Sequence, residues 1–197
     1  MIRLTWLLSI VVGVSVLVGC GDMGESTTNP PPAITSTEPG GGAPTGAAGE
    51  SGGGAPDPFQ AAPTCSSGTT WTQGNHDATH MNPGRACIAC HSTDDGPTLA
   101  IAGTVYATAH EPDLCYGEDG ANGVSVVITA ADGETLTLTP GSTGNFVGVG
   151  SVAFPYRAKI TYMGRERAMS GMQITGDCNS CHTQTGANGA PGRILLP

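Results

Sequence analysis

The chain has 197 residues, of which 31 are glycine and 5% are aromatic, and its formal net charge is −9. This acidic balance excludes nucleic acid as an expected partner, because phosphate backbones bind basic surfaces. The low aromatic content predicts a small core, and a protein partner would have to offer a basic patch.

The N-terminus has the pattern of a secretory signal peptide, with Arg3 before an apolar run at residues 7–18. A transmembrane helix is the disfavoured alternative, because a spanning helix needs about 20 apolar residues. Residues 17–20 (LVGC) resemble a bacterial lipobox. The resemblance implies a signal peptide over residues 1–19 and a lipid on Cys20, which anchors the protein to a membrane. Gly21 after that cysteine resembles an outer-membrane sorting signal, so we expect a cell-envelope lipoprotein at the periplasmic or cell-surface side.

Residues 20–63 have no apolar periodicity and are rich in Gly, Pro, Ser and Thr. Such a segment buries too little apolar surface to offset its chain entropy. We therefore predict a disordered linker over residues 20–63 that holds a folded module, residues 64–197, away from the membrane.

Two pentapeptides carry the chemistry: CIACH at residues 87–91, called the first motif, and CNSCH at residues 178–182, called the second motif. C-x-x-C-H is the attachment pattern of c-type haem. Two thioether bonds need sulfurs three residues apart on one turn of chain, and the next residue then offers its imidazole to the iron. The pattern predicts two haem c groups, with thioether bonds from Cys87, Cys90, Cys178 and Cys181 and proximal ligands His91 and His182.

Two other uses of these cysteines stay open. A Cys₄ zinc site would use all four cysteines but neither histidine, across 88 positions of sequence. A thiol redox site normally requires a βαβ context, which the sequence lacks. Haem explains both the histidines and the predicted export.

The distal haem ligands are less well defined by sequence. Methionine and histidine are both ordinary sixth ligands of haem c, and methionine raises the potential. The candidates are His80, Met81, His110 and Met169. His80 and Met81 precede the first motif, where Pro83 is well placed to begin the helix that carries Cys87. For any single methionine, core packing is the competing role.

Between the motifs the apolar period changes to two, which indicates strands near residues 104–108, 124–129, 136–138, 145–149, 156–162 and 166–169. Asp132-Gly133 predicts a hairpin turn. Short strands at this spacing indicate a mainly β fold, an antiparallel β-sandwich over about residues 101–175, with short helical or loop haem-binding segments at both of its sequence ends. An even number of strands would bring the two motifs to the same pole of the sandwich.

Four stretches resemble the carboxypeptidase regulatory-like, transthyretin-related β-sandwich: residues 103–105 (GTV), 123–126 (GVSV), 132–133 (DG) and 142–146 (STGNF). The resemblance implies a fold and no activity. The sequence departs from that family in an enlarged loop, residues 109–122, which carries His110 and Cys115 and could cover a haem.

The pairing of the remaining cysteines is predicted by assigning the others first. Cys20 is assigned to the lipid and four others to the motifs, so Cys65 and Cys115 remain. In an oxidising compartment leftover cysteines usually pair, and we predict a Cys65–Cys115 disulfide. The alternative is that one of them is free or intermolecular.

Taken together, the sequence resembles a dihaem c-type cytochrome lipoprotein, which implies electron transfer among redox proteins of the cell envelope. One alternative is a haem enzyme with an open coordination site, acting on peroxide or a small oxyanion, although no motif places a catalytic acid or arginine. Another is a structural or sensory module that haem or zinc stabilises.

Overall fold

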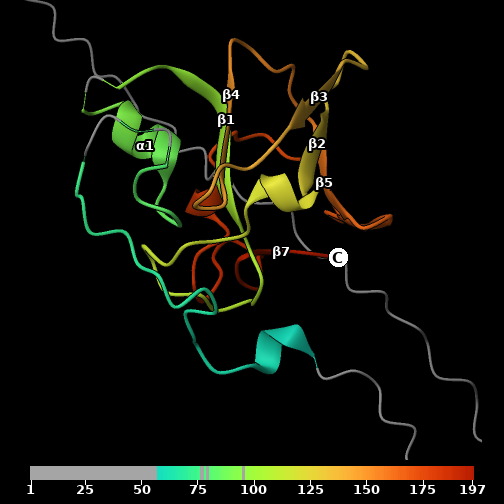
Figure 1. The fold of residues 1–197 in the computed structure, drawn as a ribbon. Coiled ribbons are helices and arrows are strands. Elements are labelled where there is room, and N and C mark those ends of the chain that lie inside the picture. Colours follow the sequence, from blue (N-terminus) through green and yellow to red (C-terminus); the bar gives the residue numbers. More distant parts are fainter. Residues whose placement is uncertain (1–56, 76–77, 79, 95) are drawn as a thin grey trace, which may run out of the picture.

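The computed structural model describes residues 57–75, 78, 80–94 and 96–197 (Figure 1). The predicted signal peptide, the lipidation site Cys20 and most of the predicted linker lie outside these residues. Within the described part, no helix has both the length and the apolarity to span a membrane.

In the described residues seven strands form two sheets, which confirms the predicted mainly β fold. One sheet has the order β4-β1-β7 and the other β3-β2-β5-β6. All pairs are antiparallel except β1 with β7. The strands are β1 (Leu99–Tyr106), β2 (Ser125–Thr129), β3 (Thr135–Leu138), β4 (Asn145–Val149), β5 (Arg157–Tyr162), β6 (Arg165–Ala168) and β7 (Ile194–Leu195).

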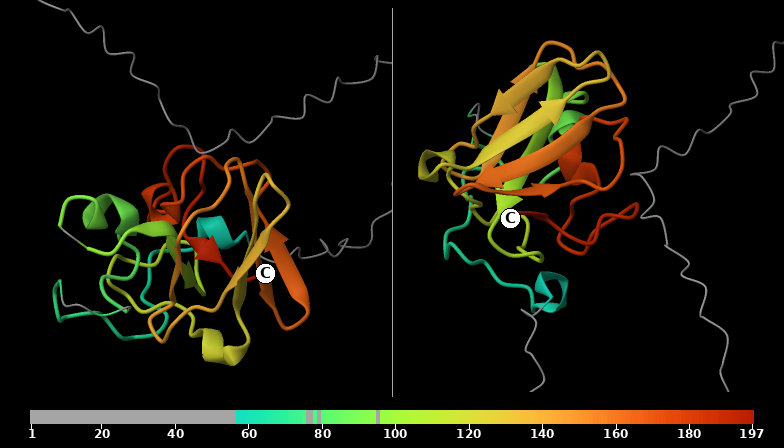
Figure 2. Two further views of the ribbon diagram at one scale, coloured as in Figure 1. Left: turned by 90° about the horizontal axis from the view of Figure 1, so that it is seen from above. Right: turned by 90° about the vertical axis from the view of Figure 1, so that its right-hand side faces the viewer.

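The core lies between the two sheets. Strand alternation directs one face of each sheet inward, so buried residues come from both of them. Figure 1 shows the β1–β4 sheet beside the β2–β3–β5 sheet, and the right-hand view of Figure 2 faces the four-stranded sheet. The buried cluster comprises Ile101, Val105, Val124, Val126, Ile128, Phe146, Tyr156 and Ile160.

The predicted hairpin is present, with β2 and β3 paired from Val126↔Leu138 to Thr129↔Thr135. Gly133 occupies the left-handed region at φ 87°, which a side chain at this position would disfavour. The observed strands differ from the predicted ones in two respects. β1 begins at Leu99, earlier than the period-two pattern indicated, and β7 was not predicted because two residues carry no periodicity.

The helical elements are short: α1 (Cys87–His91) and the 3₁₀ turns η1 (Pro58–Gln60), η2 (Gly120–Asn122) and η3 (Cys178–Ser180). The expected helix at the first motif is confirmed, but it begins at Cys87 rather than at Pro83. Ordered structure also extends into the predicted linker, because η1 lies before residue 64 and the Phe59 carbonyl accepts a hydrogen bond from His110.

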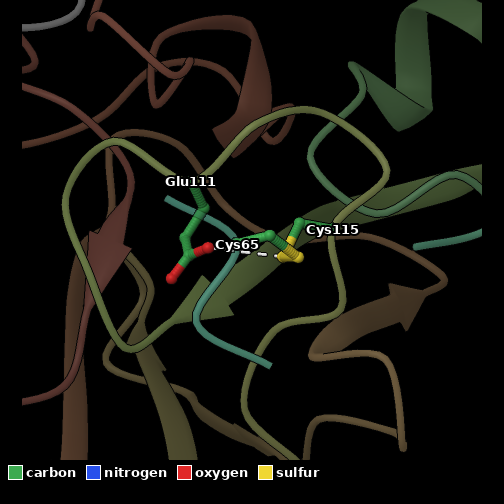
Figure 3. Close-up of side chains that lie close together, drawn as sticks. All are labelled: Cys65, Glu111 and Cys115. Carbon is green, nitrogen blue, oxygen red and sulfur yellow. Dashed lines mark hydrogen bonds between the residues drawn. A yellow bond between two sulfur atoms is a disulfide. The ribbon is translucent and has the colours of Figure 1, made fainter. Parts of the chain in front are cut away.

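The predicted Cys65–Cys115 disulfide is present (Figure 3). Glu111, which is fully buried, lies beside it and accepts hydrogen bonds from the Ser66 backbone N–H and the Thr108 hydroxyl. The bond ties the start of the folded module to the enlarged loop. That loop in turn reaches the C-terminal segment, because His110 Nδ1 lies 2.6 Å from the Gln184 carbonyl oxygen.

Candidate functional site

The two motifs, far apart in sequence, lie together in space. The Asp177 carboxylate, directly before the second motif, accepts a hydrogen bond from the Ala89 backbone N–H inside the first motif at 2.9 Å. Helix α1 has Ala86 at its N-cap position, without a side-chain cap of its own. Asp177 therefore satisfies one of the N–H groups that a helix N-terminus leaves free.

Asn179, inside the second motif, joins the same two parts of the chain. Its side-chain amide donates to the Arg85 carbonyl at 2.9 Å and to the Thr104 hydroxyl at 3.0 Å, and its oxygen accepts from the Thr104 N–H. With only 2% of its surface exposed, it connects the segment before α1 to β1.

The second motif packs against strand β1 at Gly103, which has no side chain to keep the two apart. A Cβ atom on Gly103 would lie 2.9 Å from the Cβ of Cys178, closer than real Cβ atoms approach. The glycine thus allows η3 to pack directly on the strand. Six strands, β1 to β6, lie between the motifs along the chain, and the structure brings the motifs to the same region as expected for an even number.

Both motif histidines have the same hydrogen-bond arrangement. His91 Nδ1 lies 3.1 Å from the Pro97 carbonyl oxygen, and His182 Nδ1 lies 2.9 Å from the Gly192 carbonyl oxygen. A carbonyl oxygen only accepts, so Nδ1 is the donor in both rings, and the tautomer that this arrangement favours has its lone pair on Nε2. A metal-ligating histidine is usually oriented in this way.

The charge state of His182 agrees with that role. Burial lowers the pKa of His182, partly offset by the bond to the Gly192 carbonyl, and the nearby Arg193 charge lowers it further. The ring is therefore neutral at pH 7, which is the form that coordinates a metal ion.

A cavity of about 280 Å³ opens beside the second motif. It lies between the inner face of the four-stranded sheet and the C-terminal segment, and its wall includes Cys178, His182 and Met169. Most of the other lining residues are apolar, among them Ile128, Phe146, Ile160 and Leu195. Its volume is near the lower end of the roughly 300–1,000 Å³ typical of small-molecule sites. A free cysteine thiol, an imidazole that can bind a metal and the thioether of a methionine, on an apolar wall, are the kinds of side chain that would hold a haem.

The motif thiols are poorly suited to redox catalysis. Burial, with the Asp177 charge as the next cause, raises the pKa of Cys87 to about 12, and burial likewise raises that of Cys178 to about 12. A hydrogen bond to Asp94 raises the pKa of Cys90. Reactive redox cysteines have lowered pKa values, so this environment disfavours the thiol redox alternative.

The structure also bears on the zinc alternative. In the described ranges, the one group of three or more potential ligand atoms lying within 4.8 Å of one another is Cys65, Glu111 and Cys115 (Figure 3). Its two sulfurs are joined in the disulfide, so they offer no thiolate to a metal ion. The motif cysteines form no such cluster among the described residues. Cys181 is itself disulfide-bonded here, and addition to a haem vinyl group requires that sulfur in its reduced form.

The four candidate distal ligands have different surroundings. Met169 shares the cavity with His182. His80 and Met81 lie against the segment entering β4, where their carbonyl oxygens accept from Thr143 and Asn145. His80 Nδ1 is buried and has no hydrogen-bond partner among the residues that the structure describes. His110 uses both ring nitrogens on carbonyl oxygens, so it offers a metal no lone pair in this arrangement.

Arg193 is a site residue that sequence reasoning missed. Its side chain is fully buried, pairs with Asp113 at 2.5 Å and lies over the Tyr106 ring, 5.2 Å from the ring centroid. It also donates to the carbonyls of Gly84, before the first motif, and His182, at the end of the second. The sequence signal was an isolated arginine in a Gly-rich tail of a chain with only seven cations. Asp177 and Asn179 were also missed, although both adjoin Cys178.

Comparison with known proteins gave no match: no family model, no curated protein and no solved structure resembles this chain closely enough to be significant.

Proposed function

We propose that the protein is a dihaem c-type cytochrome that transfers electrons in the bacterial cell envelope. A covalently attached haem supplies a one-electron couple whose potential depends on its axial ligands and burial. The chain's part is to hold each haem through two cysteines, to orient one imidazole toward it and to exclude water from one face.

The observation that carries the proposal is the matched geometry of His91 and His182. Each has its Nδ1 proton bonded to a backbone carbonyl, which leaves Nε2 as the ligand atom. A histidine that merely fills space has no reason to repeat this arrangement in two motifs of identical spacing.

The contact between the motifs supports direct electron exchange. Asp177 and Ala89 are joined by one hydrogen bond, and Asn179 donates another to the carbonyl of Arg85, two residues before α1. Groups attached to the two motifs would therefore be held by a common, hydrogen-bonded piece of structure rather than by independent loops.

The envelope setting of the proposal rests on the sequence. The signal-peptide pattern, the lipobox-like residues ending at Cys20 and the linker-like segment over residues 20–63 favour a module anchored at the outer membrane. With a net charge of −9, its redox partners would dock through basic patches.

Expression of the full chain with haem c maturation machinery tests the proposal. The expected result is a mature polypeptide heavier by two haems and spectra of two six-coordinate low-spin centres. A polypeptide with no covalent haem overturns the proposal, and stoichiometric zinc in its place would establish the structural alternative. A high-spin centre that binds carbon monoxide would instead establish the enzyme alternative.

A further inference from the structure

The charges around the cavity beside the second motif are unlike those of the chain as a whole. The chain has 16 acidic residues against seven Lys and Arg, yet among the residues that the structure describes no Asp or Glu lines this cavity. Three of the seven cations do line it: Lys159, Arg167 and Arg193. An apolar wall with positive charge and no negative charge selects an anionic ligand.

Two of these three cations already have partners. Arg193 is paired with Asp113, and its other donors are used by backbone carbonyls. Lys159 is paired with Glu166 at 2.7 Å.

Arg167 is different. It is the cross-strand neighbour of Ile160 and thus belongs to the inner face of the four-stranded sheet, as does Met169 two residues later. Its Nε donates to the Leu196 carbonyl at 3.0 Å, which fixes the guanidinium at the cavity edge. In the part of the chain that the structure describes, nothing pairs with its two terminal nitrogens.

We propose that this cavity binds an amphipathic anion, a flat apolar body with carboxylate groups at its edge, and that Arg167 holds a carboxylate of this ligand. This inference rests on the proposed function, because the haem of the second motif is such a ligand and its propionates are the carboxylates. Arg167 is then a positioning residue, and its planar fork matches a carboxylate. Met169 on the same face places a thioether beside the apolar body.

The test separates the carboxylate from the iron by using metal-free protoporphyrin IX and its dimethyl ester. Each is titrated by fluorescence into the full chain prepared without covalent haem, and circular dichroism verifies the fold of each variant. Arg167→Ala is expected to weaken protoporphyrin IX binding about tenfold, as for loss of a charge-assisted hydrogen bond. The same variant should leave binding of the dimethyl ester unchanged.

Arg165→Ala is the matched control, because Arg165 lies on the same strand and the same face but outside the cavity lining. It removes the same charge and should leave both titrations unchanged. Equal weakening for both porphyrins, or equal effects of both variants, overturns the inference. The inference is also wrong if the unmodified chain does not bind protoporphyrin IX. It is equally wrong if the chain binds a long-chain fatty acid instead of the porphyrin, with an affinity that depends on Arg167.

These outcomes are independent of the covalent test. If haem attaches covalently to the second motif but Arg167→Ala does not change porphyrin affinity, this inference is wrong. The dihaem proposal is then unaffected. Arg167-dependent porphyrin binding in a chain that never acquires covalent haem sustains the inference and overturns the dihaem proposal.

Discussion

The Asp177 carboxylate and the Ala89 backbone N–H form a 2.9 Å hydrogen bond across 88 positions of sequence. Asp177 directly precedes the second motif, and Ala89 lies in α1, the helix of the first motif. Because α1 spans only five residues and has no cap of its own, its stability depends on this distant acceptor. The two motifs are therefore one structural unit.

Replacing Asp177 by Ala should destabilise the protein by about 1–2 kcal/mol, the usual loss for a removed helix N-cap. Denaturant unfolding followed by circular dichroism measures the change. Glu134→Ala is the control, because Glu134 is an exposed carboxylate in the β2–β3 turn. Equal losses in the two variants would show that Asp177 has no capping role.

Replacing Asp177 by Asn should alter the pH dependence of stability. Burial is the main cause that raises the pKa of Asp177 above 3.8, against backbone hydrogen bonds that lower it. An acid with a raised folded-state pKa contributes stability that is full below 3.8 and is lost as the pH rises through the raised value. Asn keeps an acceptor for Ala89 and cannot ionise, so the variant should lose less stability than wild type between pH 3 and the neutral range.

That comparison needs unfolding free energies at several pH values for both proteins. A variant whose profile parallels that of wild type throughout would mean that Asp177 does not titrate differently in the folded and unfolded states.

Replacing Cys65 and Cys115 by Ala should lower the free energy of unfolding by about 4 kcal/mol in the chain-entropy model, because the bond closes a loop of 50 positions. Urea midpoints measure this. Cys87→Ala is a useful comparison, since its thiol is not disulfide-bonded. A loss below about 1 kcal/mol for the double variant would indicate that the enlarged loop is held without the bond.

In haem-loaded protein, Met169→Leu should convert one of two centres from low spin to high spin. Leucine keeps the apolar volume that Met169 gives to the cavity wall but has no sulfur lone pair. Absorbance and magnetic circular dichroism report the spin states. Met163→Leu, at a side chain that is 79% exposed, should change neither centre. An unchanged spectrum in Met169→Leu would assign the sixth ligand elsewhere, with His80 the next candidate.

Much of the fold could be predicted because its signals are local. Alternating side chains in β2 and β5, and Asp132-Gly133 between β2 and β3, are set by strand geometry and turn chemistry within a few residues. The Cys65–Cys115 pair followed from counting cysteines in a chain that we predict to be exported. β7 could not be found in this way, because its two residues become a strand only through pairing with Val105 and Tyr106.

The sequence by itself determined three features: two identical cysteine–histidine spacings, one leftover cysteine pair and the alternating strands. Each of these depends on residues close together in the chain or on counting residues. Only the tertiary structure decided how they are combined. Asp177, Arg167 and Arg193 acquire their roles from partners brought near by chain folding, and hydrogen bonds and ion pairs between distant residues leave no periodic trace in the sequence.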